Sequence, residues 1–78
     1  MPTVLREAGY RFYFYSREND EPPHIHVERG DKLAKYWLDP VDLASSKRFR
    51  AHELGELRNL VLQYHLTFLE AWHDHFED

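Results

Sequence analysis

The sequence contains no cysteine, which excludes both disulfide bridges and thiolate metal sites. Any bound metal ion would have to be held by imidazole and carboxylate groups. No apolar run approaches the roughly 18 residues that cross a bilayer, and the N-terminus has no charged segment followed by an apolar one. These absences predict a cytoplasmic protein with no export signal and no membrane-spanning segment.

The chain also lacks an excess of basic charge, because 10 Lys and Arg residues face 14 Asp and Glu residues and the formal net charge is −4. General nucleic-acid binders usually carry a basic field that releases counterions from phosphates. Net charge therefore disfavours RNA as a partner. The local exception is a short basic cluster, Lys47, Arg48 and Arg50, whose first interpretation is a solvated loop.

Aromatic residues are plentiful. They make up 15% of the 78 residues, within a hydrophobic fraction of 42%. A chain of this size forms one small domain, residues 1–78, and bulky rings can fill the core that such a short chain builds.

The first half of the chain predicts β-structure, because β-branched and aromatic segments alternate with turn formers. Glu7-Ala8-Gly9 suits the turn of an antiparallel hairpin, Gly30-Asp31 marks a second turn, and Asp39-Pro40 ends the last strand. The predicted strands are residues 3–6, residues 10–15, a segment that begins near His24, and residues 32–38.

The second half predicts one long amphipathic helix from about Ala51 to Phe76, because apolar residues recur there every three or four positions. Leu62 and Leu66 lie off the main apolar stripe and contact either the preceding loop, at Val41 and Leu43, or a second molecule. The main stripe consists of Leu54, Leu57, Val61, Tyr64, Phe68 and Trp72, of which Trp72 is expected in the core. The expected fold is α+β, a small antiparallel sheet of about four strands with this helix packed on one face.

Side chains alternate along a strand, so the motif "EPPHIHVERG" separates two faces. Ile25 and Val27 should face the helix, and His24, His26 and Glu28 should share the outer face. The same alternation adds a set of candidate binding residues to the outer face, namely Arg11, Tyr13, Tyr15, Lys35 and Trp37.

Three roles remain open for this face. His24 and His26 could coordinate zinc or manganese with Glu28, although the absence of any metal is favoured. The same two histidines could act as catalytic acid and base in a small RNA-directed nuclease, with Arg11 or Lys35 holding phosphate. The tyrosines, Trp37 and Arg11 are also the residue types that dominate protein-binding hot spots. His73 and His75 offer no second dyad, because residues two apart on a helix point in different directions.

Four stretches, "MPTVLREAGYRFYFYS", "EPPHIHVERG", "AKYWLDPVDLASS" and "LEAWHDHF", resemble an uncharacterised bacterial family, the domain of unknown function numbered four-one-six-zero. The resemblance implies a cytoplasmic protein encoded beside another small protein, as in toxin–antitoxin pairs, so a protein partner is expected. Self-association is the alternative. Its motif falls on Pro22, Pro23, His24, His26, Trp37, Asp39, Pro40, Trp72 and His73. The family commonly ends in a Trp-His-Glu-Tyr-Phe-like sequence, and Asp74 and His75 depart from it here.

Overall fold

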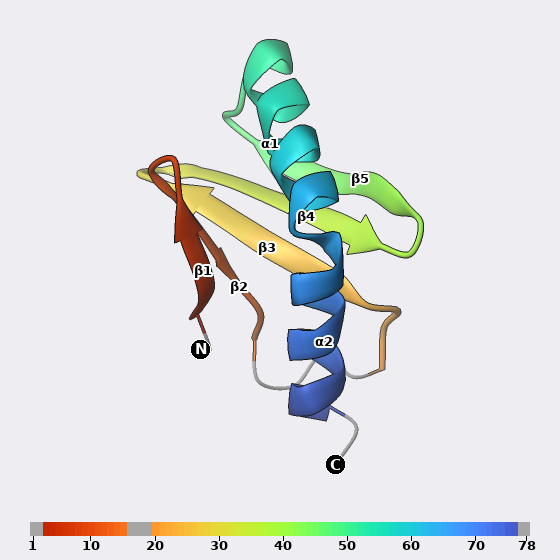
Figure 1. The fold of residues 1–78 in the computed structure, drawn as a ribbon. Helices are drawn as coiled ribbons and strands as arrows, with labels where there is room; N and C mark the ends of the chain where they lie inside the picture. Colours follow the sequence, from red (N-terminus) through yellow and green to blue (C-terminus); the bar gives the residue numbers. More distant parts are fainter. Residues whose placement is uncertain (1–2, 16–19, 77–78) are drawn as a thin grey trace.

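The computed structural model describes residues 3–15 and 20–76. Five strands precede two helices: β1 (Thr3–Glu7), β2 (Tyr10–Tyr13), β3 (His24–Arg29), β4 (Lys32–Leu38), β5 (Val41–Lys47), α1 (Ala51–Gln63) and α2 (His65–Phe76). The strands form one antiparallel sheet in the order β1-β2-β3-β4-β5, and both helices lie across the same face of it (Figure 1). The predicted α+β architecture is confirmed.

Tight turns join neighbouring strands because glycine tolerates the backbone angles that these turns need. Gly9 has φ of +83° between β1 and β2, and Gly30 has φ of +61° between β3 and β4. The turn between β4 and β5 contains a cis peptide bond between Asp39 and Pro40. Each turn stands where the sequence predicted the end of a strand.

The fifth strand was not predicted, because residues 41–47 were interpreted as loop. Their sequence, VDLASSK, is poor in β-formers, and its side chains are mostly exposed. Backbone pairing with β4 holds the segment in the sheet, and a bulge between Lys35 and Tyr36 shifts the register of that pairing. Edge strands depend on such pairing more than on side-chain burial, so the hydrophobic pattern did not reveal β5.

The predicted single helix is two helices that meet at Tyr64. The Tyr64 hydroxyl donates to the Glu7 carboxylate at 2.6 Å, and this bond raises the pKa of the Tyr64 phenol. The next residue, His65, places its ring Nε2 against the Leu38 carbonyl. Side chains anchored to β1 and β4 thus bend the chain, so that α1 lies over β4 and β5 while α2 continues along the sheet (Figure 1).

Arg50 is the N-cap of α1, and an arginine side chain has no acceptor for the free N–H groups of the first turn. The Glu53 carboxylate compensates by accepting the Arg50 backbone N–H at 2.9 Å and the Lys32 ammonium at 2.7 Å. The bond from Lys32 is the main reason that the pKa of Glu53 is lowered.

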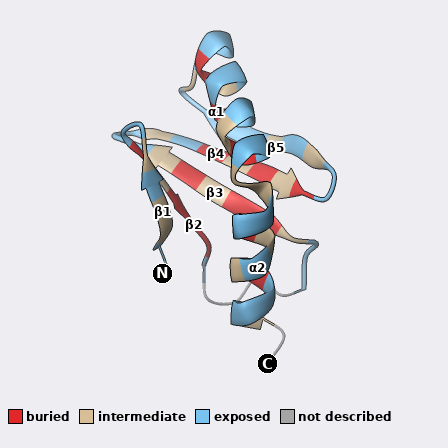
Figure 2. Ribbon diagram, in the orientation of Figure 1, coloured by how far each residue is buried: buried red, intermediate tan, exposed pale blue. Residues whose placement is uncertain are grey.

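The core lies between the sheet and the helices (Figure 2). The predicted inward residues of the strands and the apolar stripe of the helices meet there, and Trp72 is 4% exposed, as expected. The buried cluster comprises Tyr10, Phe12, Phe14, Ile25, Val27, Ala34, Tyr36, Leu38, Leu57, Val61, Phe68 and Trp72. Leu62 and Leu66 remain 47% and 70% exposed, and neither is among the hydrophobic residues that pack against this cluster. In the described residues, neither helix has the length and apolar character needed to cross a bilayer.

Candidate functional site

The sheet face opposite the helices carries rows of side chains that are paired across the strands. The first row runs Tyr13–His26–Lys35–Ser45 across β2, β3, β4 and β5. Directly opposed residues on one face have Cβ atoms about 4.5–5.5 Å apart, so each row is a line of neighbouring side chains. We call this surface the outer face, and it holds every candidate site residue named from the sequence: Arg11, Tyr13, Tyr15, His24, His26, Glu28, Lys35 and Trp37.

His26 stands at the centre of this surface and is partly exposed. Its ring stacks on Tyr13 with a centroid distance of 5.5 Å and an interplanar angle of 23°. Tyr15 meets it edge-on at 4.7 Å, and His24 does so at 5.1 Å. These three aromatic neighbours fix the orientation of the His26 ring, which is still partly exposed.

His24 has a different environment, because it is 0% exposed. Its ring lies 4.8 Å from the ring of Trp72 on α2 and 5.7 Å from that of Trp37 on β4. Its Nδ1 is 2.9 Å from the Pro22 carbonyl, which can only accept, so Nδ1 carries the hydrogen. A substrate on the outer face can reach His26 but not His24.

The charged groups of the outer face are engaged with one another. Arg11 Nε donates to Glu28 Oε1 at 2.6 Å, and the Arg11 guanidinium lies 4.1 Å from the Tyr13 ring centroid. Lys35 Nζ pairs with Glu21 at 2.7 Å and lies 4.6 Å from the Trp37 ring centroid. These contacts hold the Tyr13 and Trp37 rings in place and tie the charges to the sheet.

The proposed metal ligands His24, His26 and Glu28 are not brought together. Glu28 is turned to Arg11, and the His24 ring is buried against Trp37 and Trp72. Within residues 3–15 and 20–76 no group of three or more His, Asp or Glu side chains has a geometry that could hold a metal ion. The zinc or manganese hypothesis therefore gains no support from the geometry.

A pocket of about 220 Å³ opens beside His26. Ser45, Ser46 and Lys47 of β5 form one wall, and sequence reasoning missed all three because it assigned their segment to a loop. The pocket is lined by Tyr13, Tyr15, His26, Leu33, Ala34, Lys35, Ser45, Ser46 and Lys47. An ammonium, hydroxyls and aromatic edges around one hollow are suited to a ligand that carries a carboxylate or a phosphate.

Tyr13 cannot serve as a base in this pocket. Its burial raises the pKa of the phenol well above the ordinary value, and the hydrogen bond to Tyr15 raises it further. Since the phenol remains protonated at neutral pH, it acts as a rigid aromatic wall and a hydrogen-bond donor.

The motif residues meet at one corner of the molecule. The Pro23 carbonyl accepts the Leu38 backbone N–H at 3.0 Å, which ties "EPPH" to "WLDP", and His24 pairs with Trp37 across β3 and β4. Trp72 closes this corner from the helix side.

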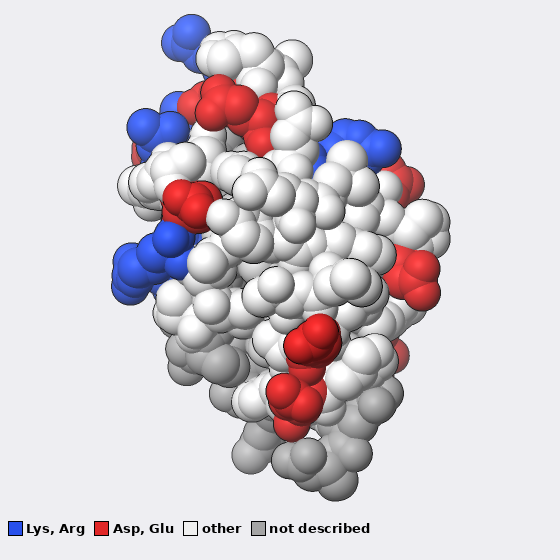
Figure 3. All heavy atoms as spheres, in the orientation of Figure 1, with Lys and Arg blue, Asp and Glu red and all other residues white. Residues whose placement is uncertain are grey.

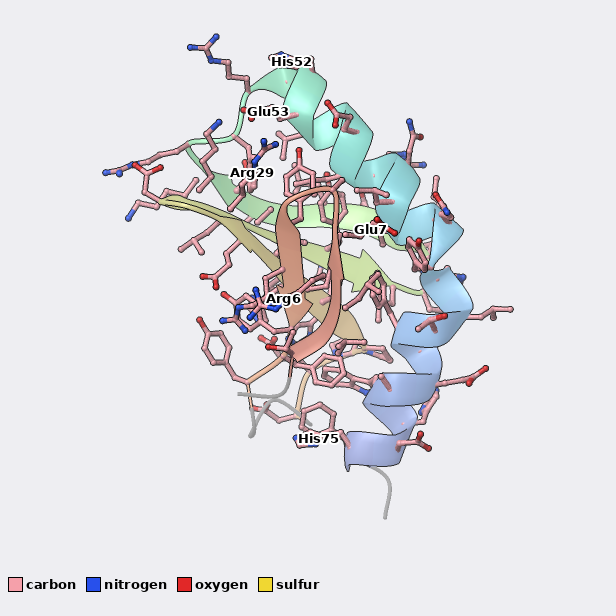
Figure 4. The ribbon with its side chains drawn as sticks, turned by 60° about the vertical axis from the view of Figure 1, so that its left-hand side comes forward. Arg6, Glu7, Arg29, His52, Glu53 and His75 are labelled. Carbon is pink, nitrogen blue, oxygen red and sulfur yellow. The ribbon has the colours of Figure 1, made fainter. Side chains whose placement is uncertain are left out.

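His73 is exposed on α2, and the His75 ring lies 5.8 Å from Phe14. Figure 4 shows His75 near the C-terminal end of α2, so neither histidine joins the outer-face histidines.

No curated protein and no solved structure gives a significant match to the chain. A family model, described as "Domain of unknown function (DUF4160)", matches residues 9–73. That range contains the "EPPHIHV" and "WLDP" motifs, all five helix-facing residues of β3 and β4, and the whole outer face. The chain therefore belongs to the DUF4160 family.

Proposed function

We propose that this chain is the protein-binding component of a two-protein, toxin–antitoxin-like module of the bacterial cytoplasm, and that its partner docks on the outer face. The observation that carries the proposal is that both helices of the described residues lie on the opposite face of the sheet (Figures 1 and 2). The uncovered face holds tyrosine, tryptophan and arginine side chains. These residue types dominate the energetic centres of protein interfaces.

The ordered arrangement of the aromatic rings on the outer face favours a role in binding a partner over a role as an ordinary solvent-exposed surface. Tyr15 is 43% exposed, yet its ring is braced edge-on against Tyr13 at 5.5 Å and against His26 at 4.7 Å. Trp37 is held between His24 and Lys35. Rings that are already ordered lose little conformational entropy when a partner covers them, and this favours affinity.

The pocket beside His26 suggests how the partner is anchored. Lys47 forms no ion pair with any described residue, and Ser45 and Ser46 place hydroxyl groups next to it. An acidic side chain of the partner would find a free ammonium there, with the Tyr15 ring beside it. The partner is therefore expected to present a carboxylate next to an apolar or aromatic anchor.

Co-expression with the product of the neighbouring gene, followed by size-exclusion chromatography with light scattering, tests the proposal. A single complex at micromolar concentration is expected, and Tyr15→Ala should weaken it by at least about tenfold, which corresponds to roughly 1.4 kcal/mol. Leu66→Ala is the matched control, because Leu66 is an exposed apolar side chain on α2, away from the outer face.

Two proteins that elute separately would overturn the proposal, as would a complex that Leu66→Ala weakens and Tyr15→Ala does not. Light scattering of the chain alone measures self-association, which is the other partner that the sequence analysis left open.

A nuclease that uses His24 and His26 as acid and base is not proposed. Both rings would have to reach the scissile phosphate, and His24 is 0% exposed. Growth arrest on expression that His26→Ala relieves would reopen that alternative.

A further inference from the structure

Basic side chains gather at one end of the sheet, where the β3–β4 turn, the end of β5 and the start of α1 meet. In Figure 3 Lys and Arg atoms lie along the left edge, at the top and in a patch at the upper right, and acidic atoms lie beside them and over the lower part of the visible face. Figure 4 shows Arg29, His52 and Glu53 at this end. We define the basic end as Arg29, Lys32, Lys47, Arg48 and Arg50.

Contacts between these segments place the basic residues together. Lys32 is paired with Arg29 across β3 and β4, and Leu33, the residue after Lys32, is opposite Lys47 in the β4–β5 register. Arg48 Nη1 reaches Asp31 in the β3–β4 turn at 2.7 Å, and Lys32 Nζ reaches Glu53 on α1 at 2.7 Å. The basic end is thus a defined surface built from three segments.

Its carboxylates do not neutralise it. Asp31 and Glu53 are each taken by one cation, Arg48 and Lys32. Arg29, Lys47 and Arg50 form no ion pair with any residue of the described chain; the Arg29 guanidinium lies over the Tyr10 ring at 5.1 Å.

The outer face differs, because Arg11 and Lys35 both have carboxylate partners within 2.7 Å. Among the described Lys and Arg residues without an ion pair, Arg29, Lys47 and Arg50 lie at the basic end, whereas Arg6 on β1 and Arg58 on α1 are not part of it. The chain as a whole has a net charge of −4. The net charge of the chain does not reveal this uneven distribution of cations.

We propose that the basic end binds the sugar–phosphate backbone of a nucleic acid. This interaction goes beyond the proposed protein partner and uses a different surface, apart from Lys47 at their border. Three unpaired cations on separate segments suit a row of phosphates, and the planar guanidinium groups of Arg29 and Arg50 match phosphate geometry.

The composition of this surface favours nucleic acid over an acidic protein. Protein interfaces centre on buried aromatic or apolar anchors, whereas nucleic-acid interfaces are more polar and more positive. The large hydrophobic side chains that the described chain exposes are Tyr15, Leu33, Leu43, Leu62 and Leu66, and Leu33 alone among them belongs to the strand end beside Lys47. Cationic groups without apolar anchors are typical of a phosphate-backbone contact.

Fluorescence anisotropy with a short labelled oligonucleotide, used once as a single strand and once as a duplex, tests this inference. Binding to at least one probe is expected at low salt. Three phosphate contacts to a duplex should weaken the affinity by roughly 40-fold between 50 and 200 mM salt, because each contact contributes a slope of about −0.9 in log K against log salt. Arg50→Gln should reduce the slope by about one contact and the affinity at low salt several-fold.

Arg58→Gln is the matched control. It removes the same charge from an exposed position inside α1, the helix that Arg50 caps, and Arg58 lies beside β5 and outside the basic end. Circular dichroism verifies that both variants fold, which is expected because Arg50 and Arg58 are exposed.

Preference for the single strand or for the duplex identifies the form of nucleic acid, and either preference supports the inference. Absence of binding to both probes at low salt overturns it, as do equal losses in Arg50→Gln and Arg58→Gln. Displacement of the oligonucleotide by poly-glutamate at equal charge concentration would assign the surface to an acidic polypeptide instead. Because the partner test relies on Tyr15, failure of one proposal leaves the other standing.

Discussion

His24 and His26 lie on the same face of β3 with their ring centroids 5.1 Å apart, but they differ in exposure to solvent. His24 is sealed between Trp37 and Trp72, whereas His26 is partly exposed beside a pocket. A His-x-His motif in a strand thus combines a packing residue at the end of the strand with a surface residue further along it.

This difference predicts unequal losses of stability. His24→Ala should lower the free energy of unfolding by about 2–4 kcal/mol, because it opens a cavity against Trp72 and removes the bond to the Pro22 carbonyl. His26→Ala should cost clearly less, because its ring is already partly hydrated. Urea denaturation of the two variants measures both losses, and equal values would contradict the assigned roles.

Two buried tyrosines should respond oppositely to the loss of a hydroxyl group. Tyr36 and Tyr10 are both 2% exposed. The Tyr36 hydroxyl donates to the Leu54 carbonyl at 2.8 Å, so Tyr36→Phe should destabilise the protein by about 1 kcal/mol. Within the described residues the Tyr10 hydroxyl has no hydrogen-bond partner, so Tyr10→Phe should be neutral or stabilising. Thermal unfolding of the pair tests this, and a larger loss in Tyr10→Phe would refute it.

Glu53 should make the protein less stable in acid. Its pKa is lowered below the ordinary value of 4.5, chiefly by the Lys32 ammonium and then by the Arg50 backbone N–H. The contribution to stability is therefore present above pH 4.5 and is lost as the pH falls through the folded-state pKa. Glu53→Gln should flatten this part of the stability–pH curve, measured by urea denaturation at neutral and acidic pH. Glu56→Gln, an exposed change on the same helix, should leave the curve unaltered.

Two glycine substitutions should change stability in opposite directions. Gly55 lies inside α1 with open space where a Cβ would stand, so Gly55→Ala should stabilise the protein by about 0.5–1 kcal/mol. Gly30 also has open space, but its φ of +61° strains any other residue, and Gly30→Ala should cost about 1 kcal/mol. A stabilising Gly30→Ala would show that the β3–β4 turn relaxes to another conformation.

Local patterns in the sequence were sufficient for most of the sheet. Period-two alternation correctly separated Ile25 and Val27 from His26, and turn formers located the ends of the strands. The three-to-four-residue spacing placed Phe68 and Trp72 in the core. These features depend on the neighbours of each residue along the chain, so they can be predicted from the sequence of a single strand or helix.

Features that depend on distant segments were not predicted. Pairing with β4 turned residues 41–47 into a strand, and anchors to Glu7 and Leu38 bent the helix at Tyr64. Alternation assigned His24 to the correct face but did not reveal that Trp72 would cover it.

By itself, the sequence determined an antiparallel sheet with an aromatic core and a polar-aromatic outer face, because side-chain periodicity sets which residues can be buried together. Only the tertiary structure decided that His26 and not His24 is accessible, that Ser45, Ser46 and Lys47 complete the pocket, and that unpaired cations meet at one end of the sheet. The physical reason is that accessibility, pockets and ion pairs depend on which distant segments contact one another in the fold. The local residue pattern of one segment does not specify those contacts.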